Sequence, residues 1–159
     1  MTQTRTFTVP AHAFLAERKI IKGADIGAFV GSSLEKTFGS FAAVGEAPSG
    51  PPRVYYYSPM AETVDLASGF PIAEELISAV ESVLSADSGL AVYRVGETEV
   101  LSIRHTGSYD TLKDSWQELS EQLRILGRPT GPVFWEEYVT MPSSEDPSAN
   151  VTDLYATLL

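Results

Sequence analysis

An order of elements that occurs twice restricts the possible folds of this chain more than any other feature. The spacing of apolar residues predicts a strand, a helix and two further strands over residues 5–71, and the same order over 89–159. Two such halves can share one antiparallel sheet, with their helices on one face and a concave opposite face for a ligand. We therefore predict a single α+β domain over residues 1–159, built from two tandem β-α-β-β repeats with a ligand cleft opposite the helices.

Matching residues in the two halves support this duplication. Tyr55 precedes Pro59 by four positions, and Tyr138 precedes Pro142 by four. Each Tyr and Pro pair is followed by a short triplet with Asp before Leu, namely Val64-Asp65-Leu66 and Thr152-Asp153-Leu154. Matched spacing that follows a helix in both halves indicates repetition. We expect Tyr55 to superpose on Tyr138 and Pro59 on Pro142.

Helical spacing of apolar residues locates the helices. The first helix begins near Asp25, and its apolar stripe comprises Ile26, Phe29, Val30, Leu34, Phe38 and Phe41. A short helix over 72–84 follows Pro71, which can occupy a first helical turn. Ser108 is expected to cap the main helix of the second half, which ends at Gly127. Residues 89–95 and 99–105 alternate in polarity and predict a hairpin around Gly96.

Composition excludes several classes of protein. The chain has no cysteine, which excludes disulfides and thiol catalysis, and its two histidines are too few for a recognisable metal site. We expect no cofactor. No segment has the composition of a signal peptide or a membrane span, so the expected location is the cytoplasm, without membrane partners. The net charge of −10 repels phosphate backbones, so we expect no nucleic-acid partner. The oligomeric state stays open.

Three motifs in the right order resemble the GyrI-like family of small-molecule-binding domains, which includes effector-binding domains of AraC- and MerR-type multidrug regulators. The motifs are His105-Thr106-Gly107-Ser108-Tyr109 with the following helix, Glu136-Glu137-Tyr138-Val139-Thr140-Met141-Pro142, and Asn150-Val151-Thr152-Asp153-Leu154. The resemblance covers nearly the whole chain and implies a ligand cleft at the junction of the two repeats, with Glu136 inside it. We expect a stand-alone form of the domain.

The residues themselves give a candidate cleft. On a strand, Glu136 shares a face with Phe134 and Tyr138, and a carboxylate among aromatic rings can bind a cation. We expect Tyr55 and Tyr57 to line the same cleft with Trp116 nearby, although each aromatic residue can equally belong to the core. Glu136 can also be a solvated strand residue, and the choice between Glu136 and Glu137 is open. Arg53, two residues before Tyr55, can clamp an anion or form an ion pair at the surface.

Three functions remain open at this point. The first is a protein that binds a small amphipathic or cationic molecule, for sensing or sequestration. The second is an enzyme, because some GyrI-like proteins resemble hydrolases that open strained cyclopropane rings; Glu136 would then activate water beside an aromatic cage. The third is an interaction protein that inhibits gyrase, as the family resemblance also implies.

Overall fold

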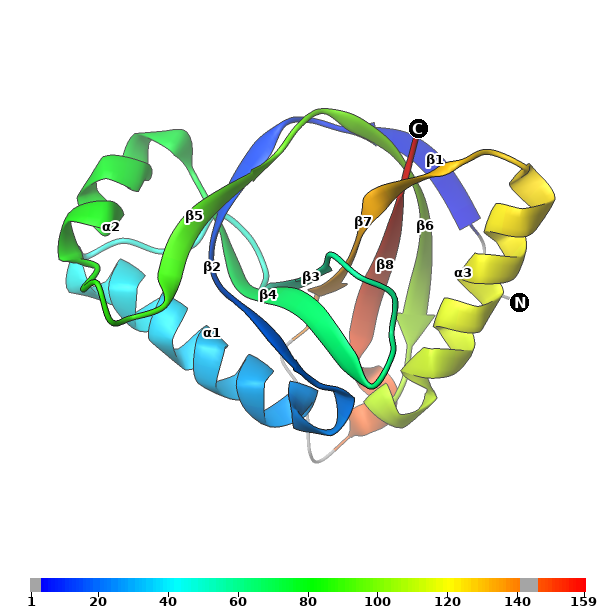
Figure 1. Cartoon of the computed structure of the whole chain (residues 1–159), viewed down its shortest axis with the longest axis horizontal. Coiled ribbons are helices and arrows are strands. Elements are labelled where there is room, and N and C mark those ends of the chain that lie inside the picture. Colours follow the sequence, from blue (N-terminus) through cyan, green and yellow to red (C-terminus); the bar gives the residue numbers. More distant parts are fainter. Residues whose placement is uncertain (1–3, 141–145) are drawn as a thin grey trace. The chain divides into compact units, whose positions relative to one another are not determined.

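The chain forms two compact units of strands and helices (Figure 1). The structure is a computed structural model that describes residues 4–140 and 146–159. One unit is Ala11–Gly96, and the other combines the first ten residues with Glu97–Leu159. All strand pairs within each unit are antiparallel, which confirms the predicted α+β class.

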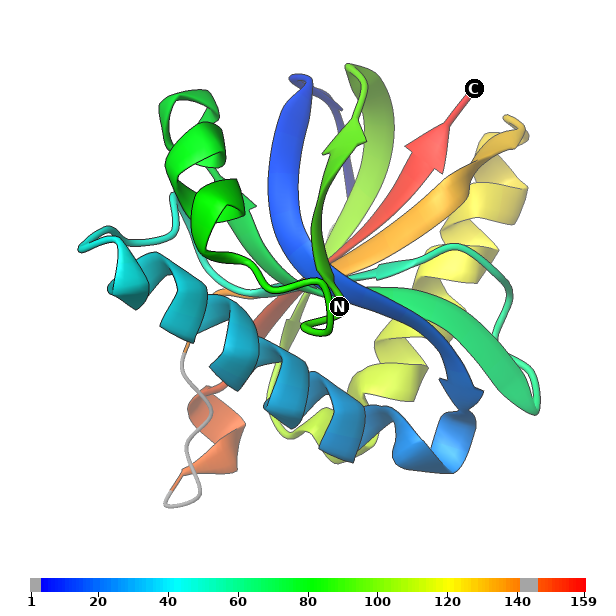
Figure 2. The same ribbon diagram turned by 60° about the vertical axis from the view of Figure 1, so that its left-hand side comes forward.

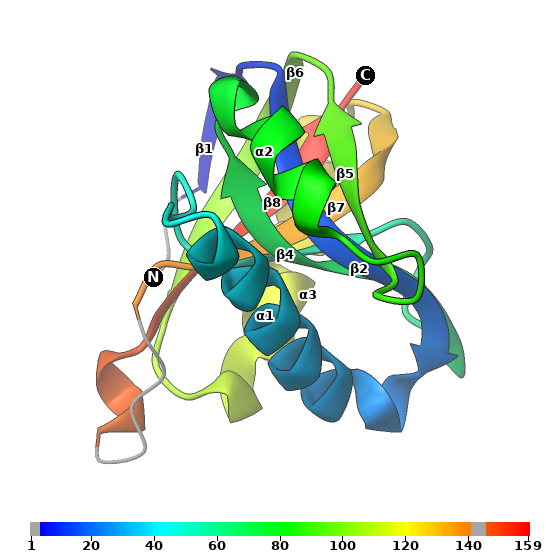
Figure 3. The same ribbon diagram turned by 90° about the vertical axis from the view of Figure 1, so that its left-hand side faces the viewer.

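The Ala11–Gly96 unit has four strands in the order β3-β4-β2-β5. Its strands are β2 (His12–Lys22), β3 (Arg53–Tyr56), β4 (Thr63–Ile72) and β5 (Leu90–Val95), and its helices are α1 (Ile26–Ala43) and α2 (Ile77–Val83). Short 3₁₀ turns at Gly23–Asp25 and Glu74–Leu76 lead into the two helices. Figure 3 looks onto α1 and α2, with the strands of this unit behind them. The predicted short helix therefore begins later than expected, because Pro71 lies in β4 opposite Phe14.

The second unit repeats the arrangement with the order β1-β6-β8-β7. Its elements are β1 (Thr4–Val9), β6 (Thr98–Thr106), α3 (Leu112–Leu126), β7 (Thr130–Tyr138) and β8 (Val151–Leu158), with 3₁₀ turns at Tyr109–Thr111 and Pro147–Ala149. The predicted hairpin around Gly96 is wrong. Strand β5 pairs with β2, whereas β6 pairs with β1 and β8. Alternating polarity identifies a strand but does not specify the strand with which it pairs.

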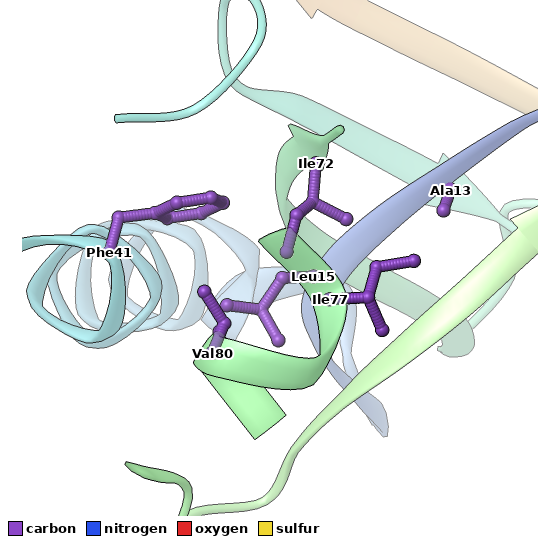
Figure 4. Packing of buried hydrophobic residues seen from close by; sticks show 6 residues of the cluster. All are labelled: Ala13, Leu15, Phe41, Ile72, Ile77 and Val80. Atoms are coloured by element: carbon purple, nitrogen blue, oxygen red, sulfur yellow. The ribbon is translucent and has the colours of Figure 1, made fainter. Parts of the chain in front are cut away.

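The core of the Ala11–Gly96 unit lies between its strands and its two helices (Figure 4). Its buried residues are Ala13, Leu15, Phe41, Ile72, Ile77 and Val80. The line of α1 that is buried consists of Ser33, Thr37 and Phe41, whereas Phe38 of the predicted stripe is 55% exposed. Thr37 can be buried because its hydroxyl donates to the carbonyl of Ser33 one turn earlier (2.8 Å).

The second unit packs α3 against β6 and β8. In Figure 2, α3 is the yellow helix on the right. Its buried residues are Leu101, Ile103, Leu119, Leu154, Ala156 and Leu158. Both predicted helix signals are present. The Ser108 hydroxyl accepts from the backbone N–H of Asp110, and Gly127 has a left-handed φ of 69° that a side chain would disfavour.

The two triplets of the repeat occupy equivalent places. In each unit the aspartate pairs with an arginine of the first strand of the repeat. Arg18 Nη2 of β2 lies 2.9 Å from Asp65 Oδ2, and Arg104 Nη2 of β6 lies 3.0 Å from Asp153 Oδ2. Each arginine adds a second bond through Nε, so both ion pairs are bidentate. The duplication therefore extends to individual side-chain interactions.

The predicted superposition of Tyr55 on Tyr138 is wrong. We call the side of the strands that packs against α1 or α3 the helix face, and the other side the reverse face. Tyr55 lies opposite Ala67, which alternates with the helix-face residue Leu66, so Tyr55 is on the reverse face. Tyr138 lies opposite Thr152, two residues from Leu154 under α3, so Tyr138 is on the helix face. Pro142, the other half of the expected match, lies outside the described residues.

Candidate ligand-binding site

A buried carboxylate lies on the helix face of the second unit. Glu136 of β7 is only 3% exposed, and two aromatic side chains donate to it. The indole N–H of Trp116, on α3, donates to Oε2 (2.7 Å), and the Tyr138 hydroxyl donates to Oε1 (2.9 Å). Hydrogen bonds to a charged group compensate part of the cost of removing it from water. The strand and the helix therefore hold this carboxylate in a fixed orientation.

Aromatic rings surround the carboxylate on both sides. Trp116 meets Phe134 edge to face, with ring centroids 6.3 Å apart, and Tyr138 meets Tyr109 in the same way at 5.8 Å. Trp116, Phe134 and Tyr138 are half-buried, whereas Tyr109 is 37% exposed. Tyr109 is therefore the most exposed ring of the cluster. We call Tyr109, Trp116, Phe134, Glu136 and Tyr138 the Glu136 cluster.

Tyr109 is a member of this cluster that the sequence placed in a family motif but that was not predicted as a site residue. Burial raises the pKa of its hydroxyl, and the negative charge of Glu136 raises it further. The spacing contains a signal that could have identified it. Tyr109 precedes Trp116 by seven residues, a spacing that indicates one helical stripe, although the structure places Tyr109 in the 3₁₀ turn before α3.

The chemistry of the cluster suits a cation. Trp116 and Tyr138 carry no charge, and their hydrogen bonds orient the Glu136 carboxylate. Ring faces next to a carboxylate add cation–π attraction of about 0.5–2 kcal/mol for a desolvated cation. The net charge of −10 gives a long-range field of the same sign.

Four of the six predicted site residues lie together, namely Trp116, Phe134, Glu136 and Tyr138. The expectation that Glu136 faces away from the helices is wrong, since it lies opposite Leu154 and bonds to Trp116 of α3. Strand alternation defines which residues share a face but not which face the helix covers. Glu137 lies opposite Asp153, on the reverse face of the same strand.

The other two predicted residues, Tyr55 and Tyr57, belong to the Ala11–Gly96 unit and lie on its reverse face. The guanidinium of Arg18 lies 3.9 Å above the Tyr57 ring while it pairs with Asp65. Burial raises the pKa of Tyr57 to about 12, although Arg18 opposes the shift. The Tyr55 hydroxyl lies 2.9 Å from Arg53 Nη1 and 2.8 Å from His12 Nε2.

Within residues 4–140 and 146–159, no group of three or more His, Cys, Asp or Glu side chains is placed to hold a metal ion. None of the helices in these ranges is long and apolar enough to cross a membrane.

Several solved structures have the fold of this chain, although comparison of sequences identifies no relative. No family model matches the sequence, and no curated protein matches it either. The C-terminal domain of EcmrR aligns over 100% of this chain and 98% of its own length, with a TM-score of 0.74 and 11% identity. In a complex of EcmrR with DNA, this chain matches 57% of the EcmrR length, with a TM-score of 0.75 and 12% identity.

Two further structures have the same fold. SAV2435 bound to tetraphenylphosphonium aligns over 99% of this chain and 94% of its own length, with a TM-score of 0.70 and 8% identity. A hydrolase from Listeria innocua aligns over 99% and 92%, with a TM-score of 0.68 and 15% identity. These likenesses support the GyrI-like fold that the sequence motifs resemble, and at such low identity they establish the fold alone.

Proposed function

We propose that this protein binds a small amphipathic cation at the Glu136 cluster. The observation that carries the proposal is the Glu136 carboxylate, 3% exposed, with two uncharged aromatic donors 2.7 and 2.9 Å from its oxygens. A cation with apolar substituents would gain from the charge and from contact with the surrounding rings. SAV2435, which has the same fold, was solved with tetraphenylphosphonium, a ligand of this chemical class.

The test compares tetraphenylphosphonium with triphenylphosphine oxide, a neutral ligand with similar aromatic groups, by titration calorimetry. Glu136→Gln keeps the shape of the side chain and removes its charge. A partly shielded ion pair contributes about 1–3 kcal/mol, so affinity for the cation should fall about five- to a hundredfold. Affinity for the neutral ligand should change little.

Glu137→Gln is the matched control, because Glu137 is the adjacent carboxylate and lies on the reverse face of β7. It should leave the affinity for both ligands nearly unchanged. Equal losses for both ligands in Glu136→Gln would show that Glu136 acts through packing, and a loss confined to Glu137→Gln would reverse the roles of the two residues.

A second candidate function is hydrolysis of a strained ring, and the same carboxylate favours it. Glu136 would accept a proton from water as the water oxygen bonds to a ring carbon. The carbon–carbon bond then breaks, and the other ring carbon takes up a proton. The likeness to a Listeria innocua hydrolase suggests testing this reaction. An electrophilic cyclopropane incubated with the protein should gain the mass of one water, and Glu136→Gln should prevent this; an unchanged substrate would exclude the reaction.

A further inference from the structure

A buried hydroxyl without a hydrogen-bond partner lies beside the Glu136 cluster. Thr152 of β8 is 0% exposed, and within residues 4–140 and 146–159 no group hydrogen-bonds to its Oγ1. A buried polar group that lacks a partner lowers the stability of the folded state, so such groups are rare in native proteins. A molecule that binds next to the hydroxyl would supply the missing partner.

Strand pairing places Thr152 next to the cluster. Thr152 lies opposite Tyr138 of β7, whose hydroxyl donates to Glu136 Oε1. Residues that lie directly opposite each other on one face of an antiparallel pair have Cβ atoms about 4.5–5.5 Å apart. Glu136 lies opposite Leu154 and is therefore the diagonal neighbour of Thr152. Diagonal neighbours are about 7–8 Å apart, a spacing that lets one small polar group contact both side chains.

The neighbour of Thr152 on the other side has partners of its own. His105 of β6 lies opposite Thr152 and is 6% exposed. Its Nδ1 lies 2.7 Å from Ser115 Oγ, and its Nε2 lies 2.9 Å from the carbonyl oxygen of Ser108. A carbonyl oxygen only accepts, so Nε2 carries a hydrogen. Both ring nitrogens of His105 thus bond to the turn and the helix that follow β6, and the Thr152 hydroxyl is left for another molecule.

The repeat shows that packing does not require a hydroxyl at this position. The two Arg–Asp ion pairs match Asp65 with Asp153, so the residue that matches Thr152 is Val64 of β4. Val64 is 1% exposed. Valine and threonine are both branched at Cβ and differ by a methyl group in place of a hydroxyl. The second unit therefore has a polar group where the Ala11–Gly96 unit fills the same buried position with hydrocarbon.

We propose that Thr152 contacts the ligand of the Glu136 cluster and that this ligand is a primary or secondary ammonium ion. The positive charge of the ligand comes from the proposed function, on which this inference rests. Such an ion has at least two N–H groups, so one can donate to the Glu136 carboxylate and another to Thr152 Oγ1. A quaternary cation can make neither bond. The Thr152 hydroxyl thus selects among cations by their N–H groups.

The exposed side of the cluster gives a route to this hydroxyl. Tyr109 is 37% exposed, and its ring meets that of Tyr138, the residue opposite Thr152. Tyr109 belongs to the 3₁₀ turn before α3 and not to the helix itself. Rotation of this one side chain would open the cluster on the side of Thr152. The apolar group of the ligand would then take the place of the Tyr109 ring against Tyr138.

The test compares benzylammonium with benzyltrimethylammonium by titration calorimetry at pH 7. Both ions carry one positive charge and the same ring, but only benzylammonium has N–H groups. Thr152→Val, which reproduces the residue at position 64, should lower the affinity for benzylammonium about five- to thirtyfold, because one hydrogen bond from a charged donor is lost. The affinity for benzyltrimethylammonium should change little. Equal changes for the two ions, or no change for either, would overturn the proposal.

Stability measurements and a conservative variant separate ligand contact from a structural role. Thr152→Val should not lower the urea midpoint of unfolding, because the hydroxyl that it removes has no partner in the described part of the chain. A lower midpoint would show that the hydroxyl stabilises the fold and would contradict the proposal. Thr152→Ser keeps the hydroxyl and should keep the affinity for benzylammonium. Val64→Thr, the reverse change in the other unit, should leave the affinity for both ions unchanged.

The same two ions distinguish this inference from the proposed function. Glu136→Gln should lower the affinity for both, since both carry the positive charge. Binding that depends on Glu136 but not on Thr152 would overturn the role of Thr152 and leave the proposed function standing. If neither ion binds to the unaltered protein, both proposals are wrong.

Discussion

The two units carry different side chains at matching positions of their helix faces. The paired aspartates, Asp65 of β4 and Asp153 of β8, occupy matching positions. The next residue of β4 is Leu66, which lies opposite Tyr56, and the next residue of β8 is Leu154, which lies opposite Glu136. Tyr56 is 9% exposed and Glu136 3% exposed, so both positions are buried. One unit thus buries a phenol where the other buries a carboxylate.

The helices above these positions differ in a corresponding way. In the Ala11–Gly96 unit the helix-face carboxylate is Glu17 of β2, which accepts from Ser33 (2.9 Å) and pairs with Lys36 (2.8 Å), both on α1. In the second unit α3 presents Ser115 to His105 (2.7 Å) and the Trp116 indole to Glu136. The described hydrogen bonds to Glu17 thus come from a serine and a lysine, and those to Glu136 come from two uncharged aromatic side chains. The two units therefore have the same arrangement of strands and helices, and they differ in the side chains that their helices present to the strands.

The most severe test of the comparison gives the Ala11–Gly96 unit a carboxylate at the position that matches Glu136. Tyr56→Glu places a carboxylate next to Leu66 without the arrangement of Trp116 and Tyr138 that holds Glu136. Burial of an uncompensated charge should lower the free energy of unfolding by about 3–5 kcal/mol in urea denaturation at pH 7. Tyr56→Phe is the control and should cost much less. A stable Tyr56→Glu protein would show that the two helix faces are interchangeable.

A smaller effect on stability should come from the Arg–Asp ion pair, which occurs once in each unit. The Arg18 guanidinium holds the pKa of Asp65 below its ordinary value, mainly through their hydrogen bonds. Because the folded-state pKa is depressed, the stabilisation is present above the unfolded-state pKa and disappears as the pH falls through the folded-state value. Asp65→Asn should lower the free energy of unfolding by about 0.2–1 kcal/mol at pH 7, since the pair is partly exposed.

This difference between Asp65→Asn and the unaltered protein should vanish in acid, once Asp65 is protonated in both the folded and unfolded states. Urea denaturation at a series of pH values measures the trend. A difference that stays constant into the acid range would show that Asp65 stabilises the protein through its shape and not through its charge.

The sequence predicted the positions of helices and strands better than it predicted which face of a strand a side chain occupies or which residues it contacts. The positions of α3, β7 and β8 follow from apolar spacing, the Ser108 cap and Gly127, which are local signals. The proximity of Trp116 to Glu136 also followed from the sequence. The match of Tyr55 with Tyr138 failed, because one residue of offset on a strand reverses the face of the side chain. His12 escaped notice because its partners, Arg53 and Tyr55, lie 41 and 43 residues away along the chain.

The pairing of β1 has a consequence for how the protein is made. Thr4 of β1 lies opposite Ile103 of β6, so β1 is synthesised almost a hundred residues before its partner. The Ala11–Gly96 unit is continuous in sequence and can complete its own strand pairing in the meantime. Until β6 is synthesised, β1 is an open strand that other nascent chains could pair with. Threonines alternate along β1, with Arg5 among them, and these polar side chains favour solubility while the strand is unpaired.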